Sequence, residues 1–355
     1  MDIKKIEKVL EKEPAFRLKQ VKKAIFGDLV GGWNEVTTLS QALRQKLAES
    51  CPLLELEAGK VLTSKDDQTV KALFRLKDGL KIESVLMKHE DGAMRLKPHL
   101  PLISSLQEEI SCRRTVCVSS QAGCAMHCQF CATGQQGFKR NLSSSEIIDQ
   151  IIFFSRLLKE TKERVSNIVF MGMGEPFLNY QNVLEAIRIL NDKDGLNIGS
   201  RHISISTCGV TEGIKKLAEE KLQVNLAISL NASNNELRTK LMPINKDYPV
   251  EKILAAVEDY VKQTKRKVMF EYLMIDGVND SPAQARELTK LLKKPLYFVN
   301  LISFNPVGHS IFKPSAGKKI KIFKETLEKA GVQVTQRHRF GKEIKAACGQ
   351  LAGGR

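Results

Sequence analysis

Three cysteines, Cys124, Cys128 and Cys131, lie within the eight-residue stretch CAMHCQFC. Thiolates are soft ligands that suit iron–sulfur clusters, and a [4Fe–4S] cluster normally takes four of them. Because the stretch offers three, one iron would keep an open position that can bind a small molecule and pass it an electron. The rest of the chain is therefore interpreted as a scaffold organised around this stretch.

The spacing C-x3-C-x2-C, with the aromatic Phe130 before the last cysteine, resembles the pattern of the radical S-adenosylmethionine (SAM) superfamily. In that superfamily the fourth iron binds the amino and carboxylate groups of SAM. The alternative is a zinc site, which would need a fourth ligand such as Cys117 or His127. The motif and the sequence that follows it favour the cluster.

The composition is compatible with a polyanionic partner. The chain has 355 residues, a formal net charge of +16 and 42% hydrophobic residues, enough for one large barrel domain or two smaller domains. A basic surface of this size most often binds nucleic acid. A solvated, lysine-rich surface explains the composition equally well. An aromatic content of 6% does not indicate a surface with many stacking platforms for bases.

The location predicted from the sequence is the cytoplasm. No run of about 18 apolar residues predicts a membrane span. The charged N-terminus lacks the apolar core of a signal peptide. Eight cysteines in such a chain favour a reducing compartment, where cysteines act as ligands or catalysts rather than as structural bridges.

Residues 1–50 are predicted to form a helical accessory domain. Pro14 can open a helix in which Phe16, Val21 and Ile25 recur at helical spacing, and residues 38–47 form a second helix. Basic residues are frequent on the other faces. An RNA-docking module and a capping domain with a charged surface are equally compatible with this stretch.

Residues 51–112 change to a period of two. Apolar residues alternate over 70–76, Asp78-Gly79 is a hairpin turn signal, and a second strand follows over 82–87. Glu83 lies in this second strand, where a carboxylate usually faces solvent. Residues 88–112 show no clear period and are interpreted as an irregular insertion. The segment is therefore predicted to be a β-hairpin extension followed by an insertion.

Residues 113–310 repeat strands and helices in alternation. Ser143 with Glu146 three residues later is a capping-box pattern that opens the clearest helix. Six β–α units predict a parallel sheet with right-handed crossovers, an α/β fold of the incomplete (β/α)6 barrel type. The predicted strands are 116–118, 168–171, 203–206, 224–229, 268–274 and 298–302.

The carboxyl ends of these strands should share one rim, where the chemistry of such folds lies. Gly172 and Gly174 would let the backbone approach a ligand closely. Ser206, Ser229 and Asn305 offer short polar side chains that can hydrogen-bond ribose hydroxyls, adenine or a carboxylate. Any one of these positions could be an ordinary turn, but their coincidence at one rim favours a SAM site.

Residues 311–355 form the last predicted segment. A basic helix over 316–330 precedes a strand-like stretch over 332–335. Cys348 follows among small residues close to the end of the sequence. Taken alone, Cys348 is interpreted as a buried apolar cysteine or an ordinary tail residue.

Longer motifs resemble the RlmN/Cfr family of radical SAM RNA methyltransferases over nearly the whole chain. That family has a radical SAM partial barrel with an N-terminal accessory domain. The resemblance implies methylation of adenosine C2 in 23S rRNA and in tRNA, or of C8 in the Cfr branch. The matching motifs are 16–20, 114–121 with the cysteine stretch, 132–137, 172–176, 242–246 and 346–351.

The resemblance also implies roles for single residues. Cys348 would carry the methyl group, Cys117 would be its partner, and Glu83 would be the general base. The SAM-contacting positions would be Gly174, Glu175, Ser206, Ser229, Leu230, Asn231 and Asn305. The cluster ligands would be Cys124, Cys128 and Cys131.

Three positions depart from the family pattern. Asn231 stands where the family usually has histidine, and the 88–112 insertion separates Glu83 from Cys117 further than usual. Phe340 is more similar to the Cfr branch. The Gly174-Glu175-Pro176 motif retains the proline typical of the RlmN branch and favours C2 methylation.

The resemblance implies partners as well. We expect 23S rRNA and tRNA as substrates, a flavodoxin- or ferredoxin-type electron donor, no membrane association and a monomer. A C8 methyltransferase remains the alternative enzyme. The alternative that is not an enzyme is an RNA-binding protein whose fold is stabilised by a bound metal.

Overall fold

The computed structural model describes residues 1–89, 113–308, 310–337 and 340–353. The insertion predicted over 88–112 therefore lies, apart from its first two residues, outside the described residues. Within the described residues, no helix has the length and apolar character needed to cross a membrane.

One continuous ten-stranded sheet organises the molecule, and seven of its strands are parallel neighbours in chain order. The six predicted strands are all present, and the strand-like stretch near residue 333 adds a seventh. The parallel strands are β4 (Arg113–Cys117), β7 (Asn167–Phe170), β8 (Ile203–Thr207), β9 (Asn225–Ser229), β10 (Val268–Met274), β11 (Tyr297–Ser303) and β12 (Gln333–Gln336).

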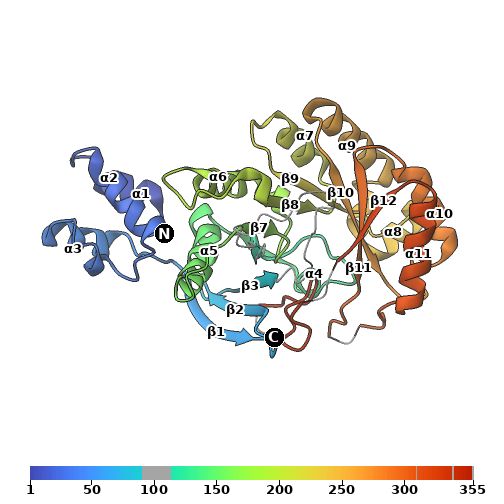
Figure 1. The fold of residues 1–355 in the computed structure, drawn as a ribbon, viewed down its shortest axis with the longest axis horizontal. Helices are drawn as coiled ribbons and strands as arrows, with labels where there is room; N and C mark the ends of the chain where they lie inside the picture. Colours follow the sequence, from blue (N-terminus) through green and yellow to red (C-terminus); the bar gives the residue numbers. More distant parts are fainter. Residues whose placement is uncertain (90–112, 309, 338–339, 354–355) are drawn as a thin grey trace, which may run out of the picture.

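Helices connect these strands and lie around the outer side of the curved sheet (Figure 1). Their apolar stripes pack on the strands, which places the hydrophobic core between the two layers. The crossover helices are α5 (Ser144–Lys159), α6 (Tyr180–Asn191), α7 (Thr211–Glu219), α8 (Asn235–Leu241), α9 (Val250–Thr264), α10 (Pro282–Leu292) and α11 (Gly317–Lys329). The predicted capping box is confirmed, because Ser143 and Glu146 each accept a hydrogen bond from the other's backbone N–H.

Three antiparallel strands extend the same sheet at its other edge: β1 (Glu57–Thr63), β2 (Thr69–Arg75) and β3 (Lys81–His89). The predicted hairpin corresponds to β2 and β3. Strand β3 pairs with β4 so that Val85 lies opposite Cys117. Strand β1 was not predicted, because this edge strand is almost entirely exposed and lacks apolar alternation.

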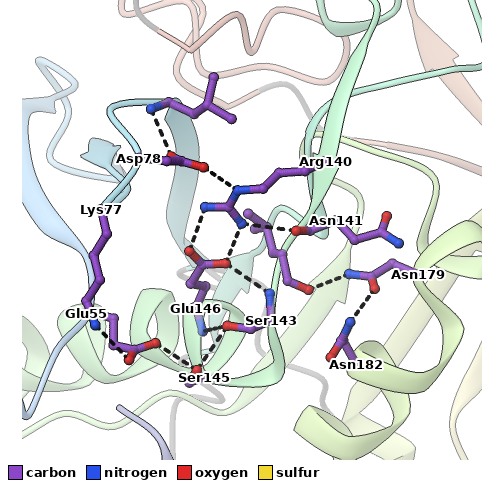
Figure 2. Close-up of polar contacts among 12 residues, drawn as sticks. Glu55, Lys77, Asp78, Arg140, Asn141, Ser143, Ser145, Glu146, Asn179 and Asn182 are labelled. Atoms are coloured by element: carbon purple, nitrogen blue, oxygen red, sulfur yellow. Dashed lines mark hydrogen bonds and ion pairs between the residues drawn. The ribbon is translucent and has the colours of Figure 1, made fainter. Parts of the chain in front are cut away.

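Arg140 attaches the hairpin to the first crossover helix. Its guanidinium pairs with Asp78 in the hairpin turn and forms two hydrogen bonds of 2.8 Å with the Glu146 carboxylate (Figure 2). On the same side, Lys77 pairs with Glu55 at 3.0 Å. These contacts fix the hairpin next to the strand that leads into the cysteine stretch.

The predicted N-terminal helical segment contains α1 (Ile3–Val9), α2 (Phe16–Lys22), which continues as a π-helical turn to Gly27, and α3 (Gln41–Ser50). Figure 1 shows these helices at one end of the molecule, beside α5 and α6. The indole of Trp33 donates a hydrogen bond of 2.6 Å to the carbonyl of Cys51, which closes this unit around its own apolar residues.

Candidate active site

The cysteine stretch forms a loop between β5 (Gln121–Gly123) and the short helix α4 (Ala132–Gln135), and β5 pairs with β6 (Phe138–Asn141). The backbone N–H of Cys124 donates to Gly137 at 3.1 Å, and that of Cys131 donates to Cys128 at 3.1 Å. A Cβ on Gly123 would lie 1.9 Å from the Gly137 carbonyl oxygen. Glycine is therefore required where this loop begins.

The three cysteines line a cavity of about 130 Å³ at the carboxyl ends of the parallel strands. Five of the seven predicted SAM-contacting residues line the same cavity: Gly174, Glu175, Ser206, Ser229 and Asn231. The structure thus brings together most of the candidate cofactor site. Leu230 and Asn305 are not among the residues that line this cavity.

Gly174 and Glu175 shape one side of the cavity. Gly174 has a φ of +103°, and a Cβ there would lie 2.5 Å from Gln121 Cβ, so only glycine fits this turn. The buried Glu175 carboxylate accepts hydrogen bonds from the backbone N–H groups of Cys208 at 2.7 Å and Phe177 at 3.1 Å. Burial raises the pKa of this carboxyl.

A buried carboxylate that sequence analysis did not single out, Glu271 on β10, organises the opposite side. It accepts hydrogen bonds from Ser206 at 2.7 Å and Ser229 at 3.2 Å, and it pairs with Arg337 at 2.8 Å. The available signal was a charged residue inside the apolar run VMFEYLM of a buried strand. Glu271 also lines the cavity, so it can contact a polar ligand there.

Leu230 and Asn231 are neighbours in sequence, but only Asn231 lines this cavity. The Leu230 side chain is fully buried, and its backbone N–H donates to the Glu271 carbonyl. Asn231 has a φ of +59° and lines the cavity, and its side-chain oxygen accepts from the Leu273 N–H at 2.9 Å. Asparagine tolerates this left-handed backbone better than most residues.

A second cavity of about 260 Å³ lies next to the first. Cys117, Arg337, Phe340 and Asn305 line it, and the side-chain amide of Asn305 donates to the Cys348 carbonyl at 3.4 Å. Cys348 lines both cavities, and its side chain is exposed to the space that they enclose. One thiol therefore faces the cysteine loop and the Cys117 cavity at once.

Cys117 is protonated at neutral pH in this environment. Burial raises the pKa of its thiol to about 12, the charge of Cys348 adds to the shift, and Arg337 opposes it. A step that uses the Cys117 thiolate must first remove this proton.

Glu83 lies outside both cavities. Its buried carboxylate pairs with Lys71 at 3.0 Å and accepts the backbone N–H groups of Ala352 at 2.6 Å and Gly353 at 3.2 Å. The structure therefore places it against the segment that follows Cys348, and the general-base role stays a prediction.

The donor set fits a [4Fe–4S] cluster better than zinc. His127 is exposed, and Cys117 lines the other cavity, so neither residue joins the three cysteines as a fourth ligand. Across the described part of the chain, no three His, Cys, Asp or Glu side chains are gathered as ligands of one ion. Cys208 and Cys348 also line this cavity, but both lie outside the C-x3-C-x2-C stretch, whose three thiols would hold the cluster.

The partial barrel, the three-cysteine loop and the cavity at the strand ends define a radical SAM enzyme. Residues 118–289 match the family model of the Radical SAM superfamily. Members of this superfamily use a [4Fe–4S] cluster and SAM, and the three cysteines would hold that cluster.

Similarity to other proteins over nearly the full length of the chain identifies the family within this class of enzyme. The chain is 44% identical to a "Probable dual-specificity RNA methyltransferase RlmN" of Thermoanaerobacter sp. (strain X514), covering 96% of this chain and 92% of that protein. It is 44% identical to the protein of the same name from Dictyoglomus thermophilum, covering 99% and 94%. The chain belongs to the RlmN family of radical SAM RNA methyltransferases.

A solved structure agrees with this assignment. The crystal structure of a radical SAM methyltransferase from Sphaerobacter thermophilus superposes with a TM-score of 0.91 at 39% identity. The superposition covers 99% of this chain and 98% of that one. The similarity therefore extends to the hairpin and to the segment that carries Cys348.

Proposed function

We propose that this enzyme methylates C2 of a specific adenosine in 23S rRNA and in tRNA, with the methyl group carried on Cys348. One observation supports the proposal most directly. Cys348 borders both the cavity of the cysteine loop and the cavity of Cys117. A carrier must meet its methyl donor on one side and its acceptor on the other, and no other cysteine of the described chain borders both cavities.

Adenine C2 is an electron-poor carbon and cannot take a methyl group from SAM by direct displacement. A cysteine thiolate can, because sulfur is a strong nucleophile. The cluster, when bound, supplies the electron that generates a 5′-deoxyadenosyl radical from SAM. Cys348 would therefore first accept a methyl group, and loss of a hydrogen atom from that methyl group would allow its carbon to bond to the ring.

Cys117 would release the product. Its thiolate attacks the Cys348 sulfur, the sulfur–carbon bond breaks, and a transient Cys117–Cys348 disulfide remains. Before this step the radical adduct would lose one electron to a one-electron acceptor such as the oxidised cluster, and the ring proton to a base. The electron pair of the broken sulfur–carbon bond then goes to the methylene carbon, which takes up a proton and stays on the base as the methyl group. Both thiols border the cavity of about 260 Å³, which is where we place the adenine.

The cofactor roles follow the geometry of the first cavity. Cys124, Cys128 and Cys131 would hold the cluster, and Gly174 would let the backbone approach the methionine end of SAM. Ser206 and Ser229, oriented by Glu271, would bind its hydroxyl or amino groups. Leu230 and Asn305 do not line this cavity, and their SAM contacts stay predictions.

The remaining proposals concern partners. We infer a cytoplasmic monomer that receives electrons from a flavodoxin- or ferredoxin-type donor. The net charge of +16 supports RNA as the substrate.

Analysis of the RNA product tests the proposed function. RNA from a strain lacking this gene is incubated with the anaerobically reconstituted enzyme, SAM and a reductant, and its nucleosides are compared with 2-methyl- and 8-methyladenosine standards. We expect 2-methyladenosine in both 23S rRNA and tRNA. 8-Methyladenosine would identify the Cfr-type reaction, and an unmodified product would contradict both.

A further inference from the structure

Lys71 on β2 and Glu83 on β3 form a buried ion pair at 3.0 Å, with side chains only 11% and 6% exposed. Removing two charges from water is costly, and such pairs are stable only when further hydrogen bonds satisfy both groups. The additional partners of this pair therefore indicate what it does.

Those partners are backbone groups on both sides of Cys348. Lys71 Nζ donates to the carbonyl of Lys345 at 3.2 Å. The free oxygen of Glu83 accepts from the N–H groups of Ala352 at 2.6 Å and Gly353 at 3.2 Å. One ion pair thus holds the chain before and after the cysteine.

The other side of the segment is bound by α4, which directly follows the cysteine loop. Thr133 Oγ1 donates to the Leu351 carbonyl at 2.7 Å, and the Gln136 amide donates to the Ala352 carbonyl at 2.6 Å. The segment is therefore fixed between the cysteine loop and the hairpin. Within this arrangement, the ion pair is the part that the hairpin contributes.

We propose that Lys71 and Glu83 are positioning residues that clamp segment 345–353 and thereby hold the Cys348 sulfur between the two cavities. This inference rests on the proposed role of Cys348 as methyl carrier. Neither Lys71 nor Glu83 lines either cavity, so they act through the backbone of the segment.

Hydrogen–deuterium exchange of the reconstituted holoenzyme tests the clamp directly, because the Ala352 and Gly353 amides are its hydrogen-bond donors. The informative variant is Lys71→Met combined with Glu83→Met. It removes both charges together, so no buried charge is left unpaired, and it keeps unbranched side chains of similar length. We expect exchange over 345–353 to become about tenfold faster or more, whereas peptides from β10 and α9 stay unchanged.

Two single variants complete the exchange experiment. Lys77→Met makes the same substitution on the same hairpin, where Lys77 pairs with Glu55 (Figure 2). Because neither residue of this pair belongs to the Lys71–Glu83 clamp, exchange over 345–353 in this variant should match the wild type. Lys71→Arg keeps a charged donor and should restore most of the protection. The proposal would be overturned if exchange over 345–353 in the double variant matched the wild type. It would also be overturned if Lys77→Met accelerated this exchange as much as the double variant does, or if the double variant accelerated exchange equally throughout the protein.

A functional measurement separates the clamp from the proposed function. Mass spectrometry of the Cys348 peptide gives the rate at which the cysteine gains a methyl group. We expect this rate to fall about tenfold in the double variant and to recover in Lys71→Arg; an unchanged rate would overturn the positioning role. Absence of methylated Cys348 in the wild type would refute the proposed function, while the exchange result would still decide the clamp.

Discussion

Cys117 and Cys348 come from opposite ends of the barrel sequence and border the same cavity of about 260 Å³. Cys117 ends β4, and the pairing of β4 with β3 and β7 fixes it in the sheet. Cys348 lies in a segment without regular secondary structure that backbone hydrogen bonds attach to the hairpin and to α4. The two thiols are therefore held by different means, one by a sheet and the other by a clamped loop.

The cluster assignment predicts that two neighbouring cysteines behave differently. Cys128→Ala should abolish the broad visible absorbance of the reconstituted cluster and all SAM cleavage, because two thiolates do not hold a cubane. Cys208 is the matched control, since it lines the same cavity as Cys128 but lies outside the motif. Cys208→Ala should keep its iron; loss of the cluster in this variant, or its retention in Cys128→Ala, would contradict the ligand set.

The raised pKa of Cys117 predicts a pH dependence. With a pKa of about 12, its thiolate fraction rises about tenfold per pH unit through the neutral range. Breakdown of the protein–RNA adduct should therefore accelerate as the pH rises from about 7 to about 9, as followed by rapid quenching and denaturing gels. Any slow adduct breakdown that remains in Cys117→Ala should lack this dependence. The same slope in both proteins would show that another group titrates.

RNA binding should weaken steeply with salt. Each phosphate contact releases counterions, and it lowers the logarithm of the affinity by roughly 0.7 to 0.9 for each tenfold rise in salt concentration. A protein with a net charge of +16 that makes several contacts should lose tenfold or more in affinity between about 50 and 200 mM salt. Filter binding or anisotropy with a 23S rRNA fragment measures this. An RNA affinity that does not change with salt concentration would mean that the basic residues form only a solvated surface.

Arg140 should contribute to stability through the hairpin. Arg140→Met leaves the mostly buried Glu146 carboxylate without its cation, which we expect to cost about 2 kcal/mol and to lower Tm by several degrees. Arg188→Met is the control, because its ion pair with Glu220 involves an arginine that is 59% exposed. Its Tm should change by less than about 1 °C. Equal shifts in the two variants would contradict the anchoring role.

Local patterns predicted much of the fold. The strands of the barrel are apolar runs, and the helix after Ser143 has its capping box, so short windows of sequence contain the signal. The cysteine loop and Gly174 were also predictable, because their spacing and backbone requirements are local. β1 was missed because its exposed side chains carry no apolar period.

The missed parts of the site depend on contacts between distant residues. Glu271 was not distinguished from its apolar neighbours, since its partners Ser206 and Arg337 come from other strands and from the C-terminal segment. The ion pair of Lys71 with Glu83 looks like two ordinary strand charges until the chain after Cys348 is placed against it. Sequence spacing carries no information about such contacts.

Alanine variants of the two thiols, compared during turnover with RNA, test directly whether Cys348 carries the methyl group. Cys117→Ala can load a methyl group and bond to the base but cannot resolve the bond. It should accumulate a covalent protein–RNA species, visible on a denaturing gel and removed by ribonuclease. Cys348→Ala and the double variant should form none, because the attachment point is gone. If neither single variant is crosslinked, or if Cys348→Ala is crosslinked as strongly as Cys117→Ala, Cys348 is not the methyl carrier.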